Sequence, residues 1–518
     1  MNSGDFSIGE IRRFMATVGV AAVSLLFALD ASAQAPIPQF IEDQGLTDTN
    51  IGRAAIGVQV TCAELIAIGA NQLDGAGQEN ELWRRCNELV VTAAERNTGT
   101  APNARTLSYS TDEELLAAFQ QVNGEEVQAS ANLSQTASYD QFSTIGARLE
   151  ALRGGSSASV TSVAANGGEF MYGSGGGAAA DSAASPFGPW GWFLRGTYTS
   201  GDRDPSEAAG FAGQENGFDY TQYGFTVGID RRSGNAVWGV ALGYNSYEVE
   251  MQNAALTGIQ TPVVEGGKIE TDSINGTFFY DVASQNNVYF SALAGYGTQS
   301  FDMLRNFIYF SNNSDPTSTQ VVDQQRIMTA APDGDSLSAA FTLGRAVYRG
   351  NVVFDPYIGV AYDRVTIDRF AEADSGNTEL GVSLGGMQLA FDEQTIDSLR
   401  SRVGFQLSNN VNTSFGSIRP MFSAEWFHEF EDEQRIIRAK YALEDDLAGQ
   451  GNFTTGFSGC VSCFEIISEE PETDYFVVGL GIAATTQRGF QSFLMLEGLL
   501  GHSYLSAYAV TVGLRGQF

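Results

Sequence analysis

Residues 188–518 alternate between large apolar side chains and small or polar ones with a period of two. In the last such segment, Tyr508, Val510, Val512 and Leu514 alternate with alanine, threonine, glycine and arginine. A period of two is typical of β-strands, in which successive side chains point to opposite faces of the sheet. The same alternation recurs over 190–198, 222–230, 238–245 and 476–483. The pattern predicts an all-β unit of about twelve antiparallel strands.

The alternation also indicates which face of the sheet meets lipid. In a soluble sandwich the apolar face is buried in the core, whereas in an outer-membrane barrel it points outward to hydrocarbon. Aromatic residues gather at the strand ends, where membrane barrels carry interfacial girdles. Charges on the opposite face would be costly against lipid but are tolerated in a wet lumen. The charged residues that we expect to face the lumen are Arg195, Asp230, Arg400, Arg402, Arg419, Glu425, Glu497 and Arg515.

Two of these charges leave a choice of partner. Arg419 and Glu425 are predicted either to contact a segment threaded through the lumen or to pair with other lumen charges.

The lengths of the connections provide an independent test of the barrel. Bacterial outer-membrane barrels have short turns at the periplasmic end and long loops at the outer end. Here the short joints lie at 232–235, 284–286, 349–351 and 487–489. They alternate with long, mostly polar stretches near 200–216, 250–268, 302–334, 367–393 and 431–472. We therefore predict an all-β transmembrane barrel over 188–518, with one short outer loop around His502 as the exception.

Residues 1–35 have the features of a secretory signal peptide. Arg12 and Arg13 precede an almost wholly apolar run from Met15 to Leu29, and small residues at 31–35 offer cleavage sites. The run is short for a membrane span, so an anchor is the weaker interpretation. The chain as a whole carries 28 Lys and Arg against 61 Asp and Glu, which argues against nucleic acid as a partner because phosphate binding needs a basic surface.

Residues 36–122 carry apolar side chains at helical spacing and form a short, passenger-like region. Cys62 and Cys86 lie on the apolar faces of two such helices. Antiparallel packing of these helices would bring the thiols within bonding distance, and exported proteins usually oxidise such pairs. We expect a disulfide here; the alternative is two core thiols that never pair.

Residues 123–187 are predicted to hold a pore helix and a linker. The preceding helix begins at a capping box, Thr111-x-x-Glu114, and Asn123-Gly124 ends it. A further helix is expected from about Glu125 to Arg153, with acidic residues first and arginine last, as the helix dipole favours. Its weakly apolar face suits a polar channel or a surface. The rest of the segment is rich in Gly, Ser and Ala, which is typical of a flexible linker.

Four stretches of the barrel half resemble the translocator barrel of the autotransporter family of type V secretion. They are residues 398–405, 418–430, 475–482 and 497–518, the last of which ends in Val512-Gly-Leu-Arg-Gly-Gln-Phe518. The resemblance covers residues 188–518 and implies a barrel of about twelve strands, a helix threading the pore and an N-terminal passenger delivered outside. It also implies that Phe518 serves as an assembly signal for the barrel-assembly machinery.

The region ahead of the barrel departs from the passengers typical of this family, which are long β-helices or enzymes. Here it is short, helical and without repeats. Some members cut themselves at an Asn pair within the pore helix, and no Asn-Asn occurs between residues 125 and 153. We therefore expect the helical region to stay attached to the barrel.

Two short motifs suggest chemistry that the rest of the sequence does not support. Gly334-Asp-Ser336-Leu matches an esterase block, but it begins a strand, and neither of the two histidines lies in the Asp-x-x-His arrangement that such esterases use. Cys460-Val-Ser-Cys463 could be a redox or metal motif, but it has no second Cys pair or nearby His, so a loop disulfide is the preferred interpretation. We expect no enzyme activity, no cofactor and no metal site.

The sequence therefore favours an outer-membrane, autotransporter-type barrel that translocates or displays its short N-terminal region at the cell surface. The alternative is a porin-like or structural barrel whose helical region stays in the periplasm. The expected partners are outer-membrane lipid, lipopolysaccharide and the barrel-assembly machinery, and the barrel is expected to be monomeric. The sequence names no surface ligand, and the acidic loops contain no complete calcium motif.

Overall fold

The structure is a computed structural model, and it describes most of the helical region and the barrel. The described residues are 35–72, 77–100, 107, 111–124, 127–129, 142, 145, 149, 190–204, 217–251, 267–284, 286–311, 322–374, 386–486 and 490–517. The predicted signal peptide up to residue 34, the linker 154–187 and Phe518 lie outside these ranges. Six residues of the predicted pore helix fall inside them, and all six are helical.

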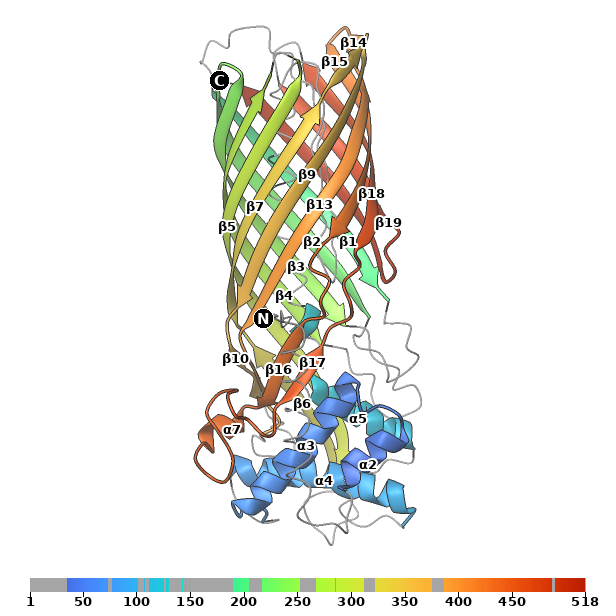
Figure 1. Ribbon diagram of the computed structural model, residues 1–518, viewed down its shortest axis with the longest axis vertical. Helices are drawn as coiled ribbons and strands as arrows, with labels where there is room; N and C mark the ends of the chain where they lie inside the picture. The colour runs from blue at the N-terminus through green and yellow to red at the C-terminus, as the bar shows by residue number, and fades with distance from the viewer. Residues whose placement is uncertain are drawn as a thin grey trace, which may run out of the picture.

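A closed antiparallel barrel of 12 long strands forms the larger part of the molecule (Figure 1). Each strand pairs with its neighbours in the chain, and the first strand also pairs with the last, so the sheet has no free edge along the wall. The fold predicted from the sequence is confirmed. The strands are β1 (Trp190–Arg203), β2 (Phe218–Ser233), β3 (Ala236–Met251), β4 (Lys268–Ala283), β5 (Val288–Ser311), β7 (Asp333–Arg345), β9 (Val352–Ile367), β13 (Gln394–Asn409), β15 (Gly416–Glu429), β18 (Asp474–Thr486), β19 (Gln491–Leu500) and β20 (Leu505–Gln517).

The apolar side of the barrel wall points outward and the polar side inward. On β2, Tyr223 and Val227 are 61% and 44% exposed, whereas Gln222 and Thr226 on the opposite face are 0% and 4% exposed. Exposed aromatic and aliphatic side chains recur in this way on the other long strands. An apolar outer face with polar residues inside is the arrangement that lipid selects.

The two ends of the barrel carry different connections. At the turn end, β1 begins and β20 ends, and β2 joins β3 through Gly234 and Asn235. Gly234 has φ +63°, a value that a tight hairpin requires and that glycine adopts without strain. The long connections between β5 and β7, between β9 and β13, and between β15 and β18 all lie at the opposite end, the loop end. Connection length therefore alternates as the sequence predicts.

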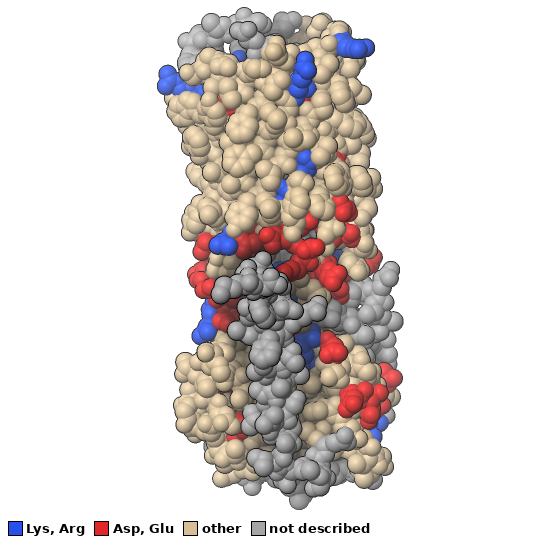
Figure 2. Space-filling view, in the orientation of Figure 1, with Lys and Arg blue, Asp and Glu red and all other residues tan. Residues whose placement is uncertain are grey.

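A band of acidic residues marks the loop end of the wall. Figure 2 shows a wall with little charge and a belt of Asp and Glu where the barrel meets the rest of the molecule. Exposed carboxylates near this end of β5 and β7 include Asp302, Asp333 and Asp335. Because a carboxylate against hydrocarbon is costly, lipid contact must end on the turn side of this belt.

The loop end also carries structure that the sequence led us to expect as polar loop. Strand β5 continues beyond the wall and pairs with β6 (Val322–Ala330), which pairs with β11 (Ala373–Asp374). The two longest connections form a separate four-stranded sheet, which we call the loop sheet. Its strands are β10 (Phe370–Ala371), β12 (Leu389–Phe391), β16 (Ile436–Tyr441) and β17 (Phe464–Ile467), with helix α7 (Leu443–Asp446) after β16. Short strands β8 (Val347–Arg349) and β14 (Val411–Thr413) lie at the turn end.

Four helices of the described N-terminal residues also lie at the loop end, on the side of the molecule opposite the C-terminus (Figure 1). They are α2 (Pro36–Asp43), α3 (Asn50–Ala67), α4 (Gln78–Thr98) and α5 (Asp112–Asn123), and we call them the helical unit. The capping box at Thr111 and Glu114 is formed, and Gly124 ends α5 with φ +66°. None of the described helices is long and apolar enough to cross a membrane.

The helical unit and the loop sheet share one hydrophobic core. Ile41, Val58, Leu89 and Phe119 of the helices pack in the same buried cluster as the loop-sheet residues Leu389, Phe391, Ile437 and Phe464. The sequence did not show that the apolar residues of the loops would be buried, because their partners lie far away in the chain. The hydrogen bond from Asn50 to Ile467, for example, spans a separation of 417. We call the helical unit together with the loop sheet the cap.

Candidate functional site

The barrel lumen is lined by the charged residues that the sequence assigned to it. All eight have side chains buried on the inner side of the wall, at 7% exposure or less: Arg195, Asp230, Arg400, Arg402, Arg419, Glu425, Glu497 and Arg515. Their burial on the face opposite the exposed aromatics follows from strand alternation. The inner face of the wall therefore carries charges of both signs.

Arg400 of β13 is held in the lumen by two carboxylates. It lies 3.4 Å from Glu429 of β15 and 3.7 Å from Asp363 of β9, both fully buried. The hydroxyl of Ser398 donates a hydrogen bond to Glu429 at 2.7 Å, and the hydroxyl of Ser338 donates one to Asp363. Charges that lie this deep are stable only when they are paired and hydrogen-bonded.

Other lumen charges bind to the wall itself. Tyr357 donates a hydrogen bond to Glu425 at 2.7 Å, and Arg419 donates one to Asn410 at 2.7 Å. Arg402 donates to the hydroxyl of Thr342 at 2.6 Å. These contacts join Arg419 and Glu425 to neutral side chains of the barrel, so the choice between the threaded segment and other lumen charges as their partners stays a prediction.

The predicted pore helix contributes side chains to the lumen core. Phe142, Ile145 and Leu149 are helical, at most 4% exposed, and belong to the same buried cluster as Phe193 and Leu293 of the wall. Their spacing of three and four residues places them on one face of a helix. A Cβ placed on Gly295, which faces the lumen from β5, would lie 3.1 Å from Cε1 of Phe142. Glycine at this position lets the wall and the helix approach closely.

Side chains of helix α3 bind the backbone at the edge of the loop sheet through hydrogen bonds. The side chain of Asn50 donates to the carbonyl of Ile467 at 2.9 Å and accepts from its N–H at 2.8 Å. Arg53 donates to the carbonyl of Glu465 at 2.9 Å. Together these bonds satisfy an exposed strand edge, which would otherwise be free to pair with another chain.

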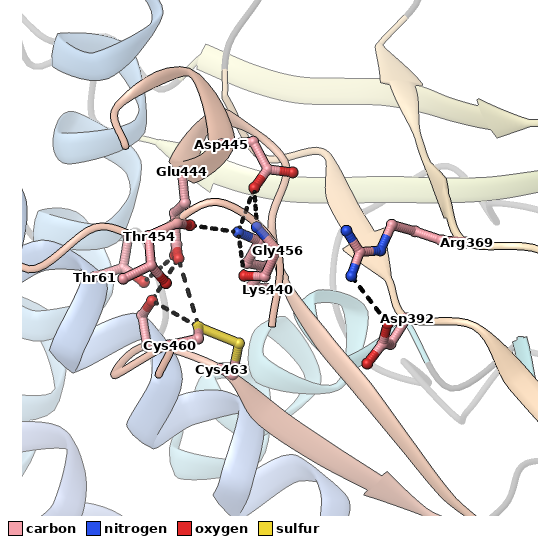
Figure 3. Close-up of a disulfide and its surroundings, with 11 residues drawn as sticks. Thr61, Arg369, Asp392, Lys440, Glu444, Asp445, Thr454, Gly456, Cys460 and Cys463 are labelled. Carbon is pink, nitrogen blue, oxygen red and sulfur yellow. Dashed lines mark hydrogen bonds and ion pairs between the residues drawn. A yellow bond between two sulfur atoms is a disulfide. The ribbon is translucent and has the colours of Figure 1, made fainter. Parts of the chain in front are cut away.

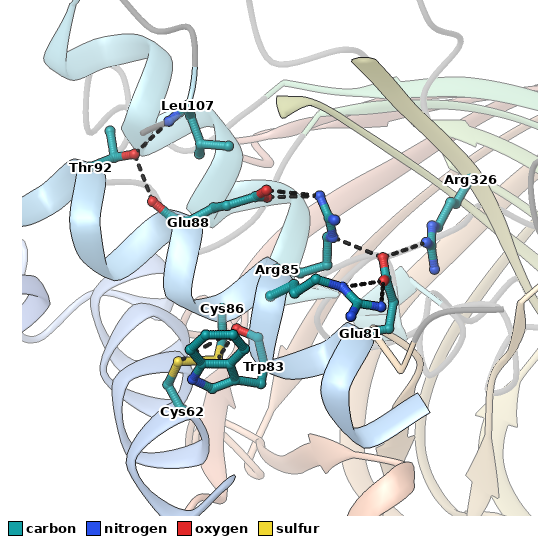
Figure 4. A network of polar contacts seen from close by, with 10 residues as sticks. Cys62, Glu81, Trp83, Arg85, Cys86, Glu88, Thr92, Leu107 and Arg326 are labelled. Atoms are coloured by element: carbon teal, nitrogen blue, oxygen red, sulfur yellow. Dashed lines mark hydrogen bonds and ion pairs between the residues drawn. A yellow bond between two sulfur atoms is a disulfide. The ribbon is translucent and has the colours of Figure 1, made fainter. Parts of the chain in front are cut away.

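The disulfide between Cys62 and Cys86 joins α3 to α4 inside the helical unit (Figure 4). A second disulfide, Cys460–Cys463, closes a small loop next to β17 (Figure 3). Both disulfides expected from the sequence are therefore present.

A buried charge network ties helix α4 to the barrel extension (Figure 4). Arg326 of β6 is 1% exposed and lies 3.4 Å from Glu81 and 2.8 Å from Asp374. Glu81 also accepts hydrogen bonds from Arg84 at 2.8 Å and from Arg85 at 2.9 Å. Burial by itself raises the pKa of Glu81, but Arg85, Arg84 and Arg326 more than offset this, so its pKa lies below the usual value.

A second arginine fixes the end of helix α5. Arg305 of β5 donates a hydrogen bond to the carbonyl of Gln121 at 2.6 Å and one to Glu372 at 2.8 Å. Cations near a helix C-terminus are favourable because the helix dipole is negative there. Nothing in the local sequence pointed to Arg305, Arg326 or Glu81, since each partner is supplied by a distant element.

The family model for the autotransporter beta-domain matches residues 192–496, which is well over half of the chain. The chain belongs to the autotransporter β-domain family. It is an outer-membrane barrel of type V secretion, as the sequence predicts. No curated protein matches the chain.

Solved structures of other autotransporter barrels are similar to this autotransporter. The translocator domain of NalP from Neisseria meningitidis aligns with a TM-score of 0.43 and 15% identity over 65% of this chain and 91% of that one. The β-domain of BrkA from Bordetella has a TM-score of 0.38 and 14% identity over 64% and 100%. The transport unit of AIDA-I from Escherichia coli has a TM-score of 0.37 and 10% identity over 65% and 93%.

The esterase-like motif lies within the wall of the autotransporter barrel. Ser336 sits inside β7 and is fully buried, facing the lumen.

At the loop end, burial and nearby Arg203 lower the pKa of His502 to about 3, so its ring is neutral. Its Nδ1 accepts hydrogen bonds from the N–H groups of Tyr504 and Leu505, which is a structural role. Among the described residues, no group of His, Cys, Asp and Glu could hold a metal ion.

Proposed function

We propose that this autotransporter carries its own N-terminal helical unit through the barrel and keeps it at the cell surface as a permanent cap on the outer loops. The position of the helical unit is the observation that carries the proposal. Helix α5 ends at Asn123 at the loop end, whereas β1 begins at Trp190 at the turn end. The chain between them must therefore pass from one end of the barrel to the other.

The route through the lumen supports translocation. Phe142, Ile145 and Leu149 belong to the connecting segment, and all three pack among inward-facing residues of the wall. In outer-membrane barrels the long loops face outward and the short turns face the periplasm. With that orientation the helical unit lies outside. A porin-like barrel with periplasmic helices would require them at the turn end.

The contacts within the cap support permanent attachment. The helical unit shares its core with the loop sheet, and buried ion pairs such as Arg326–Glu81 cross the boundary between them. Separating the two would expose apolar surface and leave buried charges unpaired, which is costly. The absence of an Asn pair between residues 125 and 153 in the sequence agrees with retention.

The outer surface is consistent with the partners expected for such a barrel. The exposed apolar wall suits outer-membrane lipid, and the adjacent acidic belt suits the polar headgroup layer, where lipopolysaccharide lies in the outer leaflet. We propose a monomeric barrel inserted by the barrel-assembly machinery through the C-terminal Phe518.

Protease treatment of intact cells tests whether the helical unit is displayed at the cell surface. A recognition site for a specific protease is inserted after Gly99, an exposed residue between α4 and α5, and in a matched variant after Gly234, an exposed residue of the β2–β3 turn. Protease added to intact cells should cut the Gly99 variant and leave the Gly234 variant whole until the outer membrane is opened. Protection of the Gly99 site on intact cells, followed by cleavage after lysis, would favour the porin-like alternative.

A further inference from the structure

The Cys460–Cys463 disulfide lies beside a buried carboxylic acid in the cap (Figure 3). Oε2 of Glu444, on helix α7, is 3.9 Å from Sγ of Cys460. Both cysteines are half-buried, and Val461 between them is 41% exposed, so a reagent can approach the disulfide from solvent. The other disulfide offers a contrast, because Cys62 and Cys86 are only 2% and 0% exposed.

Glu444 is held against the sulfur by neutral partners. Its side chain is 1% exposed, and it accepts hydrogen bonds from Ser462, which lies between the two cysteines, and from Thr61 of α3 at 3.2 Å. The titratable groups that face it are Lys440 and Tyr441 of β16 and its neighbour Asp445 on α7. Lys440 is committed elsewhere: its ammonium lies 2.7 Å from Asp445 and donates to the carbonyls of Thr454 and Gly456.

This environment lets Glu444 exchange a proton near neutral pH. Burial raises the pKa of Glu444 to about 7, and the hydrogen bond from Ser462 and the charge of Lys440 offset only part of that effect. A group whose pKa is close to the working pH can act both as acid and as base. A disulfide that only closes a small loop gains nothing from such a neighbour, and burying a carboxyl costs free energy.

We propose that Cys460–Cys463 is a redox-active disulfide that exchanges with dithiols, and that Glu444 transfers the proton to and from Cys460. The substrate class is a dithiol of a peptide or of another protein that reaches the surface of the cap. The chemistry does not depend on which side of the membrane the cap lies, so its test is independent of the display proposal.

The exchange proceeds in two steps. A thiolate of the dithiol attacks Sγ of Cys463, the bond between the two cysteine sulfurs breaks, and Sγ of Cys460 leaves with the electron pair and takes the proton of neutral Glu444. The second thiolate of the dithiol then attacks the first sulfur of the same dithiol, which is bonded to Cys463 in the mixed disulfide. The thiolate of Cys463 leaves and takes a proton from water. The dithiol is oxidised by two electrons to a disulfide, the protein disulfide is reduced to two thiols, and Glu444 regains its proton from solvent.

The pH dependence of reduction distinguishes this mechanism from simple exposure. The full chain in detergent micelles is treated with dithiothreitol, and free thiols are trapped with a maleimide and assigned to each disulfide by mass spectrometry. Rates are expressed per dithiothreitol thiolate, so that only the protein contributes to their pH dependence. For the wild type, the rate at Cys460–Cys463 should fall as pH rises through about 7, because Glu444 then loses the proton that it donates.

Two variants complete the test. Glu444→Gln should have a flat profile and, at a pH near 6, a rate lower than that of the wild type by about tenfold or more. Glu64→Gln is the matched control, because Glu64 of α3 binds Asn452 of the same loop, and it should keep the wild-type profile. If Glu444→Gln does not fold, the pH dependence of the reduction rate in the wild type still tests the proposal. A flat wild-type profile, or reduction of Cys460–Cys463 no faster than that of Cys62–Cys86, would overturn the proposal.

Discussion

At the scale of single residues, Arg326 has the largest consequence for how the cap is joined to the barrel. It belongs to β6, an extension of the barrel wall, and its partners belong to helix α4 and to a loop strand. Three segments distant in sequence therefore meet at one guanidinium that is 1% exposed. Removing one partner of a buried ionic network leaves the other charges uncompensated, which costs more than losing an exposed pair.

Replacing this arginine should loosen the helical unit. We expect Arg326→Met to lower the stability of the helical unit by about 3–5 kcal/mol. The matched control is Arg96→Met, which removes a half-exposed pair with Asp112 at 3.5 Å and should cost at most about 1 kcal/mol. The urea dependence of proteolysis of the helical unit measures both effects, and equal losses in the two variants would contradict the argument.

At the scale of secondary-structure elements, the barrel wall and the segment inside it are fitted to each other. The wall contributes glycine at Gly295 where the ring of Phe142 approaches, and the segment contributes one apolar face that packs against inward-facing apolar residues of the wall. A helix with an apolar stripe can therefore lie in the lumen without burying unpaired charge.

A pair of cysteines should detect this approach. In the double variant Phe142→Cys with Gly295→Cys, a short bifunctional thiol reagent should join the two positions, because both lie in the lumen. The control pairs Phe142→Cys with Ala294→Cys, whose side chain is exposed on the outer face of the same strand. Cleavage of the chain between the two positions, followed by mass spectrometry, measures the cross-link. Equal cross-linking in both variants would show that Phe142 is not held against the inner wall.

At the scale of the whole molecule, the two largest hydrophobic cores of the described residues divide the protein into a barrel and a cap. One buried cluster lies in the lumen, and the other joins the helices to the loop sheet. The Cys62–Cys86 disulfide belongs only to the second core. The wall is held by a closed set of strand pairs and does not depend on that core.

Heating in detergent micelles should therefore produce two transitions. The double variant Cys62→Ala with Cys86→Ala should lower the midpoint of the helical transition by roughly 10 °C or more, since a disulfide of this loop length contributes about 3 kcal/mol. The barrel transition should not move. Far-ultraviolet circular dichroism follows helix and strand signals separately, and a single transition that shifts as a whole would refute the division.

The sequence by itself determined the barrel, because strand alternation and the segregation of connections are local patterns. It specified which face of each strand meets lipid, the capping box at Thr111 and the two cysteine pairs. Residues such as Arg400 and Glu425 could be assigned to the lumen for the same reason, since strand parity alone decides which face they occupy.

Only the tertiary structure decided what the long loops do. The loop sheet, helix α2 and the partners of Arg326 were not predicted, because short apolar runs such as Leu389–Phe391 become meaningful only against helices distant in the chain. The setting of Cys460–Cys463 is of the same kind, since Glu444 and Thr61 reach it from other segments. Local periodicity specifies the faces of an element, but its partners depend on contacts between segments far apart in sequence, which no local pattern encodes.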